Sequence, residues 1–218
     1  MNGSSPLRQE IRRKSFLHKK HTSGPEYLSR LFIQEMQMKI LTFAASSSRN
    51  SINKALVTYA AGLLEAGILE NAEIEILDMN DFEIPLYSID REKEDGIPDQ
   101  AALFYEKIGV ADALLISYAE HNGYYTAVFK NLLDWVSRIE RKIYQDKPAV
   151  LLASSPGSRG ARRVLKVAKE AAPSLGMDVK AALSLPRFND NFDKLAGRVT
   201  SAEIQAELEL ALAVLNEN

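Results

Sequence analysis

Short apolar runs alternate with longer amphipathic segments from Met38 onward, and this alternation is the strongest constraint on the fold. Runs such as ALLIS at 113–117 are short and almost wholly apolar, which is typical of strands covered on both faces. Segments such as 125–141 carry apolar residues at helical spacing. The expected strands are residues 39–43, 73–77, 113–117, 149–153 and 178–183, and the expected helices are residues 51–66, 100–108, 125–141, 161–175 and 201–215.

Strands that alternate with helices predict a parallel sheet, because each helix returns the chain across one face of the sheet. The handedness of such crossovers leaves two common layouts, the flavodoxin-like strand order 2-1-3-4-5 and the six-stranded dinucleotide fold. We expect the first, an α/β three-layer sandwich around a five-stranded parallel sheet. Ligands of such sheets bind beyond the carboxyl ends of the strands. That rule selects three loops, residues 44–51, 118–124 and 154–160.

The segment 1–37 differs from the rest of the chain in charge and pattern. It holds seven Lys/Arg and three Asp/Glu residues, a net charge of +4, whereas the remainder holds 20 and 26, a net charge of −6. It shows neither a sustained apolar period nor the apolar stretch of a secretory signal. We therefore expect a flexible or non-native extension at 1–37 and one domain at 38–218. A functional basic arm is the alternative. The acidic residues disfavour an organellar transit peptide.

Composition excludes several classes of protein. The 218 residues include no cysteine, so disulfides, thiolate metal sites and thiol catalysis are excluded. No apolar run is long enough to cross a bilayer. A net charge of −2 gives no reason to expect nucleic acid or a membrane as a partner. A cytoplasmic protein is the plain interpretation.

The first selected loop is rich in hydroxyl groups and precedes a helix. Backbone N–H groups at a helix amino terminus lack partners and attract anions. Serine hydroxyls, an amide and a guanidinium add donors suited to a phosphate monoester. A single capping serine in a polar loop is the simpler alternative. The loop has neither a GxxxxGK[ST] nor a GxGxxG pattern, which favours a mononucleotide phosphate. The candidate phosphate ligands are Ser46, Ser48, Arg49, Ser51 and Asn53.

The stretch YAEHNGYYTAVFKNLLDW at 118–135 resembles the NADPH-dependent FMN reductase family, flavodoxin-like enzymes that include quinone, azo-dye and chromate reductases. That family typically shows PEYN-x-S-x-P-x-x-L-K-N-x-x-D-W here, and S-x-R-x-x-S-x-N in the first loop. The chain departs from the pattern at Ala119, where proline is usual, and at His121, where tyrosine is usual. Ser48 stands at the arginine position of the first loop. The residues that match the longer motif are Glu120, Asn122, Lys130, Asn131, Asp134 and Trp135.

The resemblance implies an FMN site built from all three loops. It implies that Ser46, Ser51 and Asn53 hold the phosphate of FMN. It also implies that the second loop runs along the flavin ring and that the third lies beside its pyrimidine edge. The implied ring contacts are Ala119, Glu120, His121, Asn122, Ser154, Ser155, Pro156 and Gly157.

The resemblance implies a homodimer or tetramer that assembles through the helix bearing Lys130 and Asp134. An exposed ion pair at i,i+4 is the alternative for these two residues. Trp135 is expected in the core. Arg162 and Arg163 stand at the start of a helix, where cations oppose the dipole. They are either solvated or receive an anion such as the 2′-phosphate of NADPH.

The implied activity is an FMN-dependent oxidoreductase. Hydride from NADPH or NADH would pass through N5 of FMN to a quinone, an azo compound, a free flavin or a similar small acceptor. No residue is assigned a catalytic role of its own, and no metal site is expected. The acidic stretch PRFNDNFD at 186–193 lacks the glycine and distal glutamate of a calcium loop and reads as a surface loop. A flavodoxin-type electron carrier without NAD(P)H oxidation and a relative that binds no flavin remain as alternatives.

Overall fold

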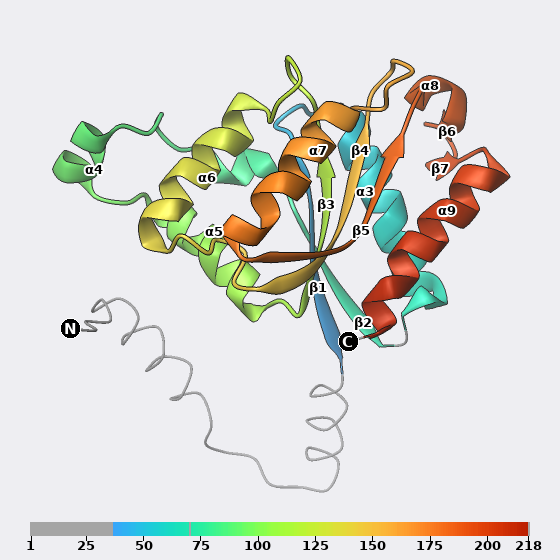
Figure 1. Cartoon of the computed structure of the whole chain (residues 1–218), viewed down its shortest axis with the longest axis horizontal. Coiled ribbons are helices and arrows are strands. Elements are labelled where there is room, and N and C mark those ends of the chain that lie inside the picture. The colour runs from blue at the N-terminus through green and yellow to red at the C-terminus, as the bar shows by residue number, and fades with distance from the viewer. Residues whose placement is uncertain (1–36, 70, 218) are drawn as a thin grey trace, which may run out of the picture. The chain divides into compact units, whose positions relative to one another are not determined.

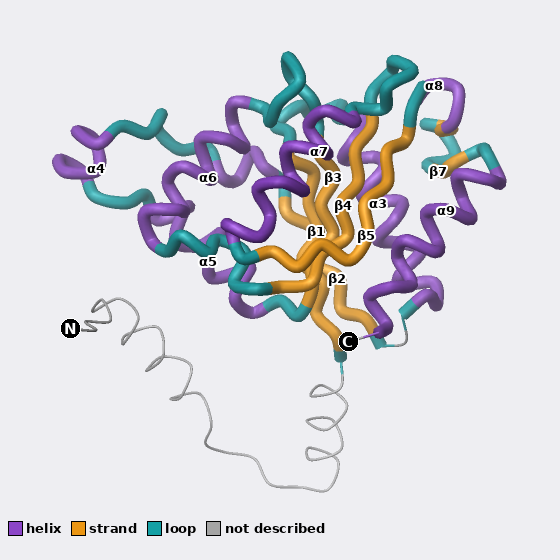
Figure 2. Tube along the Cα trace, viewed as in Figure 1, coloured by secondary structure: helices purple, strands orange, loops and turns teal. Residues whose placement is uncertain are grey.

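A computed structural model describes residues 37–69 and 71–217, so the expected extension lies almost entirely outside the described residues. Five parallel strands form a sheet in the order β2-β1-β3-β4-β5, which confirms the flavodoxin-like α/β prediction. Figures 1 and 2 show the sheet between two layers of helices. The strands are β1 (Met38–Ala45), β2 (Ala72–Leu77), β3 (Ala113–Tyr118), β4 (Lys147–Ser154) and β5 (Met177–Leu185).

Helices cover both faces of this sheet and form two separate apolar cores. The helices α5, α6 and α7 pack on one face, around residues such as Phe104, Phe129 and Val164. The helices α3 and α9 pack on the other, around residues such as Leu56 and Leu208. The helices are α3 (Ile52–Leu63), α4 (Ile89–Asp95), α5 (Asp99–Val110), α6 (Ala127–Ile139), α7 (Arg162–Ala171), α8 (Phe188–Asn191) and α9 (Ala202–Ala213), with helical turns η1 (Leu64–Ile68), η2 (Met79–Phe82), η3 (Ala172–Leu175) and η4 (Val214–Glu217).

Both faces of the central strands are apolar, because helices cover both faces of the sheet. Every residue of β3 is buried, as are the last six residues of β1. Alternate residues of β1 therefore divide between the two cores, with Leu41 and Phe43 in one and Ile40 and Ala44 in the other. Burial of this kind, at roughly 25 cal/mol per Å² of apolar surface, stabilises the packing of both helical layers on the sheet.

Two segments differ from the expectation. The stretch at 186–193 is not a surface loop: it forms α8 and the strand β6 (Phe192–Asp193), which pairs with β7 (Arg198–Val199). Phe188 and Phe192 are buried and stack at 4.6 Å, so aromatic packing organises a stretch that looks polar in sequence. The stretch at 79–97, for which we expected neither a strand nor a helix, carries η2 and the exposed helix α4. No residue of α4 is buried, and Figure 1 shows it apart from the sheet.

Polar side chains fix the starts of the two helices nearest the expected site. Ser51 caps α3 by accepting from the N–H of Lys54, and Thr126 caps α6 by accepting from the N–H of Phe129. Thr126 also donates from Oγ1 to the carbonyl of Ala45 at 2.9 Å. That bond ties the start of α6 to the end of β1. Both helices therefore begin at the carboxyl edge of the sheet, beside the loops selected from the sequence.

Candidate functional site

The three loops selected from the sequence follow adjacent strands at one edge of the sheet. In the ladder, Ala45 at the end of β1 stands opposite Tyr118 at the end of β3. Tyr118 in turn stands opposite Ala153, one residue before the end of β4. The loops that follow β1, β3 and β4 are therefore neighbours, as the order 2-1-3-4-5 requires.

The first loop combines an internal turn with exposed donors. Ser46 is buried, and its Oγ accepts from the N–H of Ser48 at 3.2 Å. Ser51 Oγ accepts from the N–H of Lys54 at 3.2 Å. Both hydroxyls act as acceptors in these bonds, so their O–H groups are free to donate. Ser48 and Arg49 are exposed.

This loop fits a phosphate group. The backbone N–H groups of Arg49, Ile52 and Asn53 have no hydrogen-bond acceptor among the described residues. The side chain of Arg49 forms no salt bridge within the described part of the chain. Free N–H groups and the positive end of a helix dipole favour an anion at this place. The loop is thus not closed on itself, and it has donors left for a ligand.

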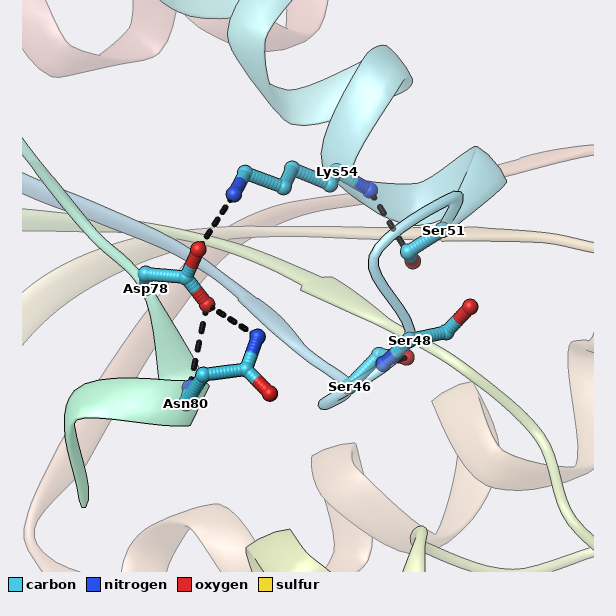
Figure 3. Close-up of polar contacts among 6 residues, drawn as sticks. All are labelled: Ser46, Ser48, Ser51, Lys54, Asp78 and Asn80. Atoms are coloured by element: carbon cyan, nitrogen blue, oxygen red, sulfur yellow. Dashed lines mark hydrogen bonds and ion pairs between the residues drawn. The ribbon is translucent and has the colours of Figure 1, made fainter. Parts of the chain in front are cut away.

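An ion pair lies beside the phosphate-type loop. Lys54 Nζ is 2.5 Å from Asp78 Oδ2 (Figure 3). Asp78 Oδ1 accepts from the backbone N–H of Asn80 at 3.0 Å and from its side-chain Nδ2 at 2.7 Å. The hydrogen bond from Lys54, followed by that from the Asn80 backbone, lowers the pKa of Asp78 from 3.8 to about 2. The carboxylate is therefore ionised at neutral pH, and Lys54 offsets its charge near the loop.

Asn53 joins the first loop to the other strands. Its Nδ2 donates to the carbonyl of Ser154 at 3.1 Å, and its Oδ1 accepts from the Ser154 N–H at 2.9 Å. The same Oδ1 accepts from Ser117 Oγ at 2.8 Å. All three residues are buried. The amide therefore holds the start of α3 against β3 and β4, and only the backbone N–H of Asn53 faces the loop as a free donor.

The second loop is a tight hairpin that the sequence analysis did not identify. His121 and Tyr124 exchange two backbone hydrogen bonds of 3.0 Å. Between them Asn122 has φ 54° and Gly123 has φ 82°. Positive φ at both central residues defines a type I′ turn, for which Asn-Gly is the favoured dipeptide. The NG pair within a predicted ligand loop was the signal that could have found it. His121 is exposed on this hairpin.

Glu120 links the second loop to the helix after the third. Its Oε2 accepts from the backbone N–H groups of Arg163 and Val164, each at 3.0 Å. These are N–H groups of the first turn of α7, which no side chain at its own start caps. A carboxylate at a helix amino terminus is favourable, and here it also offsets the neighbouring arginines. The carboxylate of Glu120 is thus engaged in positioning the two loops.

The third loop depends on Gly160 rather than on Gly157 for its backbone conformation. Gly160 has φ 58°, and a Cβ at this residue would lie 2.3 Å from Ser184 Oγ and 2.8 Å from the Pro186 nitrogen. Gly157 does not have a positive φ, and the atom nearest to a Cβ built on it is Ser155 Oγ at 4.0 Å. Gly157 and Pro156 are exposed, so the tip of the loop is open to a ligand.

Aromatic residues support the second loop from below. Tyr118 contacts Tyr125 with ring centroids 5.7 Å apart, and Tyr125 contacts the half-exposed Tyr124 at 5.1 Å. Burial raises the pKa of Tyr118, Tyr125 and Tyr144, so these phenols stay protonated across the physiological range. The uncharged rings of Tyr118 and Tyr125 therefore form the packing surface beneath the hairpin at 121–124.

The comparisons with known proteins agree with this arrangement. A family model described as NADPH-dependent FMN reductase matches residues 38–190, which include all three loops. The chain belongs to this family. None of the described helices is long and apolar enough to span a bilayer.

Individual relatives within and around this family carry related names. The chain is 36% identical over 126 residues to an NAD(P)H-dependent FMN reductase of Pseudomonas aeruginosa, and the aligned segment covers 58% of this chain and 64% of the relative. It is 29% identical over 127 residues to a quinone reductase of Escherichia coli K12, and the aligned segment covers 58% of this chain and 65% of the relative. The chain thus spans slightly less than two thirds of the length of these curated relatives.

Solved structures share the fold. The flavoenzyme NAD(P)H:acceptor oxidoreductase FerB of Paracoccus denitrificans superposes with a TM-score of 0.67 at 21% identity, and the match covers 83% of this chain and 98% of that one. An azoreductase of Bacillus anthracis superposes with a TM-score of 0.57 at 17% identity, and the match covers 84% of this chain and 100% of that one.

Proposed function

We propose that the chain is an FMN-dependent oxidoreductase that takes hydride from NADPH or NADH and passes electrons to a small acceptor. The observation that carries the proposal is the first loop, whose free N–H groups and hydroxyls stand at the start of α3 inside the segment matched by the family. FMN, when bound, supplies the hydride-accepting chemistry through its ring. The protein supplies binding, orientation and electrostatic tuning.

In this proposal the first loop holds the phosphate of FMN. Ser46 and Ser51 donate from the O–H groups that their capping bonds leave free. Ser48 and Arg49 contribute an exposed hydroxyl and a cation. Asn53 contributes its backbone N–H, because its side-chain amide is engaged with Ser117 and Ser154. A dianionic phosphate gains most from donors that are fixed in advance, as Ser46, Ser51 and the backbone N–H of Asn53 are.

The other two loops border the ring of FMN in this proposal. The backbone of Ala119 and the hairpin residues His121 and Asn122 run along one side of the ring, with Glu120 fixing their position through α7. On the other side, Gly157 leaves space for close approach of the ring. The remaining third-loop residues of the proposed site are Ser154, Ser155 and Pro156, of which Ser154 is buried and bonded to Asn53 and to the Leu185 carbonyl.

The electron acceptor in our proposal is a small oxidant such as a quinone, an azo compound or a free flavin. The names of the relatives support this class, since they include a quinone reductase and an azoreductase. We also propose assembly with a second copy through α6, whose Lys130 and Asp134 form a half-exposed ion pair of 2.6 Å. Trp135 on the same helix is a core residue, and its Nε1 donates to the carbonyl of Pro85 at 2.7 Å.

A test separates this enzyme from a flavodoxin-type electron carrier. Purified protein is loaded with FMN, and oxidation of NADPH and NADH is followed at 340 nm with a quinone as the acceptor. We expect yellow protein with saturable FMN binding and direct NAD(P)H oxidation. A carrier would bind FMN but would oxidise NAD(P)H only with a partner reductase. Failure to bind FMN at all would refute the proposed function.

A further inference from the structure

The tip of the second loop presents two rings on one face. His121 and Tyr124 stand opposite each other in the hairpin and exchange two backbone hydrogen bonds of 3.0 Å. Directly opposite residues of an antiparallel pair point to the same face, with Cβ atoms about 4.5–5.5 Å apart. His121 is exposed, and Tyr124 is 46% exposed. Neither the imidazole nor the Tyr124 hydroxyl forms a hydrogen bond with a described residue, so the polar atoms of both rings are free.

This hairpin is held in place without a ligand. Its turn is of type I′, and the stem of Arg163 lies against it, since Arg163 Cδ is 3.2 Å from the place of a Cβ on Gly123. From below, the Tyr124 ring makes an edge contact with the buried Tyr125, with ring centroids 5.1 Å apart. Glu120 joins the same loop to the start of α7. A surface that is fixed in advance loses less conformational entropy when it binds a ligand.

These two rings are the only exposed ones on the three loops of the candidate site. The loops at 44–51, 118–124 and 154–160 are described throughout, and the single other aromatic residue among them, Tyr118, is buried. Figure 1 shows the loop between β3 and α6 and the loop between β4 and α7 projecting beyond the strand ends at the same edge of the sheet. A flat molecule that approaches these loops from solvent therefore meets an aromatic surface only at the hairpin.

The chemistry of the pair suits a flat ring that carries oxygen atoms. Aromatic side chains bind other rings by stacking or by edge contacts. The phenol of Tyr124 and an N–H of the His121 imidazole also donate hydrogen bonds, which carbonyl oxygens at the rim of a ring accept. A small inorganic oxidant has no ring and gains nothing from the first of these contacts.

We propose that His121 and Tyr124 select the electron acceptor and favour flat aromatic carbonyl compounds, fused-ring quinones in particular, over oxidants without a ring. The inference rests on the proposed function and deepens it by naming the acceptor class and the residues that recognise it. The pair departs from the family motif, which has tyrosine and serine at these two positions.

The arginines around the start of α7 are the competing feature. Arg159 and Arg162 are exposed and form no salt bridge with a described residue. Cations at this edge would favour an anionic oxidant whether or not it carries a ring. Arg163 is less suited to a comparison, because its stem lies against the hairpin. The variant R159A/R162A therefore separates the effect of charge from the effect of the rings.

The test compares two acceptors in the FMN-loaded enzyme at saturating NADPH: menadione, a neutral fused-ring quinone, and ferricyanide, an inorganic anion. We expect Y124S to raise the KM for menadione about five- to tenfold, through the loss of one aromatic contact and one hydrogen bond, and to leave the KM for ferricyanide within about twofold. Y124F keeps the ring, so it should raise the KM for menadione by only about two- to threefold. R159A/R162A should raise only the KM for ferricyanide.

A direct measurement removes the dependence on turnover. Menadione is titrated calorimetrically into oxidised, FMN-loaded protein of matched flavin content without NADPH, so that nothing is reduced. The chain has no cysteine that a quinone could alkylate. We expect Y124S and H121A each to bind menadione about fivefold more weakly than wild type, and R159A/R162A to bind it as wild type does. Circular dichroism checks that each variant is folded.

Several results would overturn the inference. These are an equal effect of Y124S on both acceptors, an unchanged menadione affinity in Y124S, or a loss of menadione affinity in R159A/R162A. A change in the sedimenting mass of Y124S would also overturn it, because Tyr124 would then be a contact between copies of the chain. A wild type that binds no FMN, or that oxidises NADPH with neither acceptor, would instead refute the proposed function.

Discussion

At the scale of single residues, Asn53 links the candidate site to β3 and β4 through three side-chain hydrogen bonds. Replacing it with alanine leaves the Ser154 N–H and the Ser117 hydroxyl buried without their partner. We expect N53A to lower the free energy of unfolding by about 2–4 kcal/mol, since each buried unsatisfied group costs about 1–3 kcal/mol. Urea unfolding measures this. N50A removes an exposed asparagine of the same loop and should change stability little; equal losses would contradict the role assigned to Asn53.

A second residue-scale prediction concerns acid stability. The pKa of Asp78 falls from 3.8 to about 2 in the folded protein, chiefly through its hydrogen bond to Lys54. Because the folded pKa is lowered, the stabilisation is present above about pH 4 and is lost as the pH falls toward 2. We expect the stability difference between wild type and D78N to shrink over that window. Unfolding curves at pH 7, 4, 3 and 2 would show it, and a pH-independent difference would contradict the assignment.

The residue types at the site were readable from the sequence, but their partners were not. Ser46, Ser51 and Asn53 were identified as a group because they follow a strand and begin a helix. The amide of Asn53 is bonded to a residue 101 positions away, so no local pattern reveals that it is engaged. Glu120 was assigned to the flavin ring for its motif, whereas its carboxylate caps α7. Long-range hydrogen bonds decide such roles.

At the scale of elements, the third loop gives a matched pair of glycine variants. We expect G160A to cost about 2–4 kcal/mol of folding free energy, because an alanine at φ 58° is strained and its Cβ would meet Ser184 and Pro186. G157A should leave stability within about 0.5 kcal/mol, since space is open there. In the proposed site G157A should instead weaken FMN binding. Fluorescence titration with FMN and urea unfolding distinguish the two, and a reversed pattern would contradict this account of the loop.

The elements that alternate in hydropathy were predicted correctly, and those fixed by tertiary packing were not. The apolar runs at 113–117 and 149–153 are buried strands, as predicted. A strand that is covered on both faces is apolar at nearly every residue, so the local sequence alone is enough to identify it. The stretch at 186–193 has five polar or charged residues around two phenylalanines, and the two rings stack at 4.6 Å where it forms α8 and β6. The stretch at 79–97 shows no sustained apolar period, and α4 has no buried residue. The ion pair between Arg138 of α6 and Glu92 in the middle of α4, at 2.8 Å, is one of its links to the rest of the chain.

At the scale of the whole molecule, the order of the sheet followed from alternation and crossover handedness, whereas assembly depends on surfaces that one chain does not explain. Two ion pairs at i,i+4 provide a matched comparison. Lys130–Asp134 on α6 measures 2.6 Å, and Lys142–Asp146 measures 3.0 Å and is more exposed. The first lies on the proposed interface with a second copy, and the second does not.

Charge reversal at each lysine therefore tests the proposed dimer. K130E and K142E both replace an attractive pair by a repulsive one, at a cost of a few tenths of a kcal/mol within the chain. In a dimer that packs through α6, K130E also buries two uncompensated carboxylates against the partner, which costs far more. We expect wild type and K142E to sediment at twice the chain mass of 24.3 kDa or more, and K130E to sediment as the 24.3 kDa monomer. A monomeric wild type would refute the proposed dimer, and equal behaviour of the two variants would place its interface away from α6.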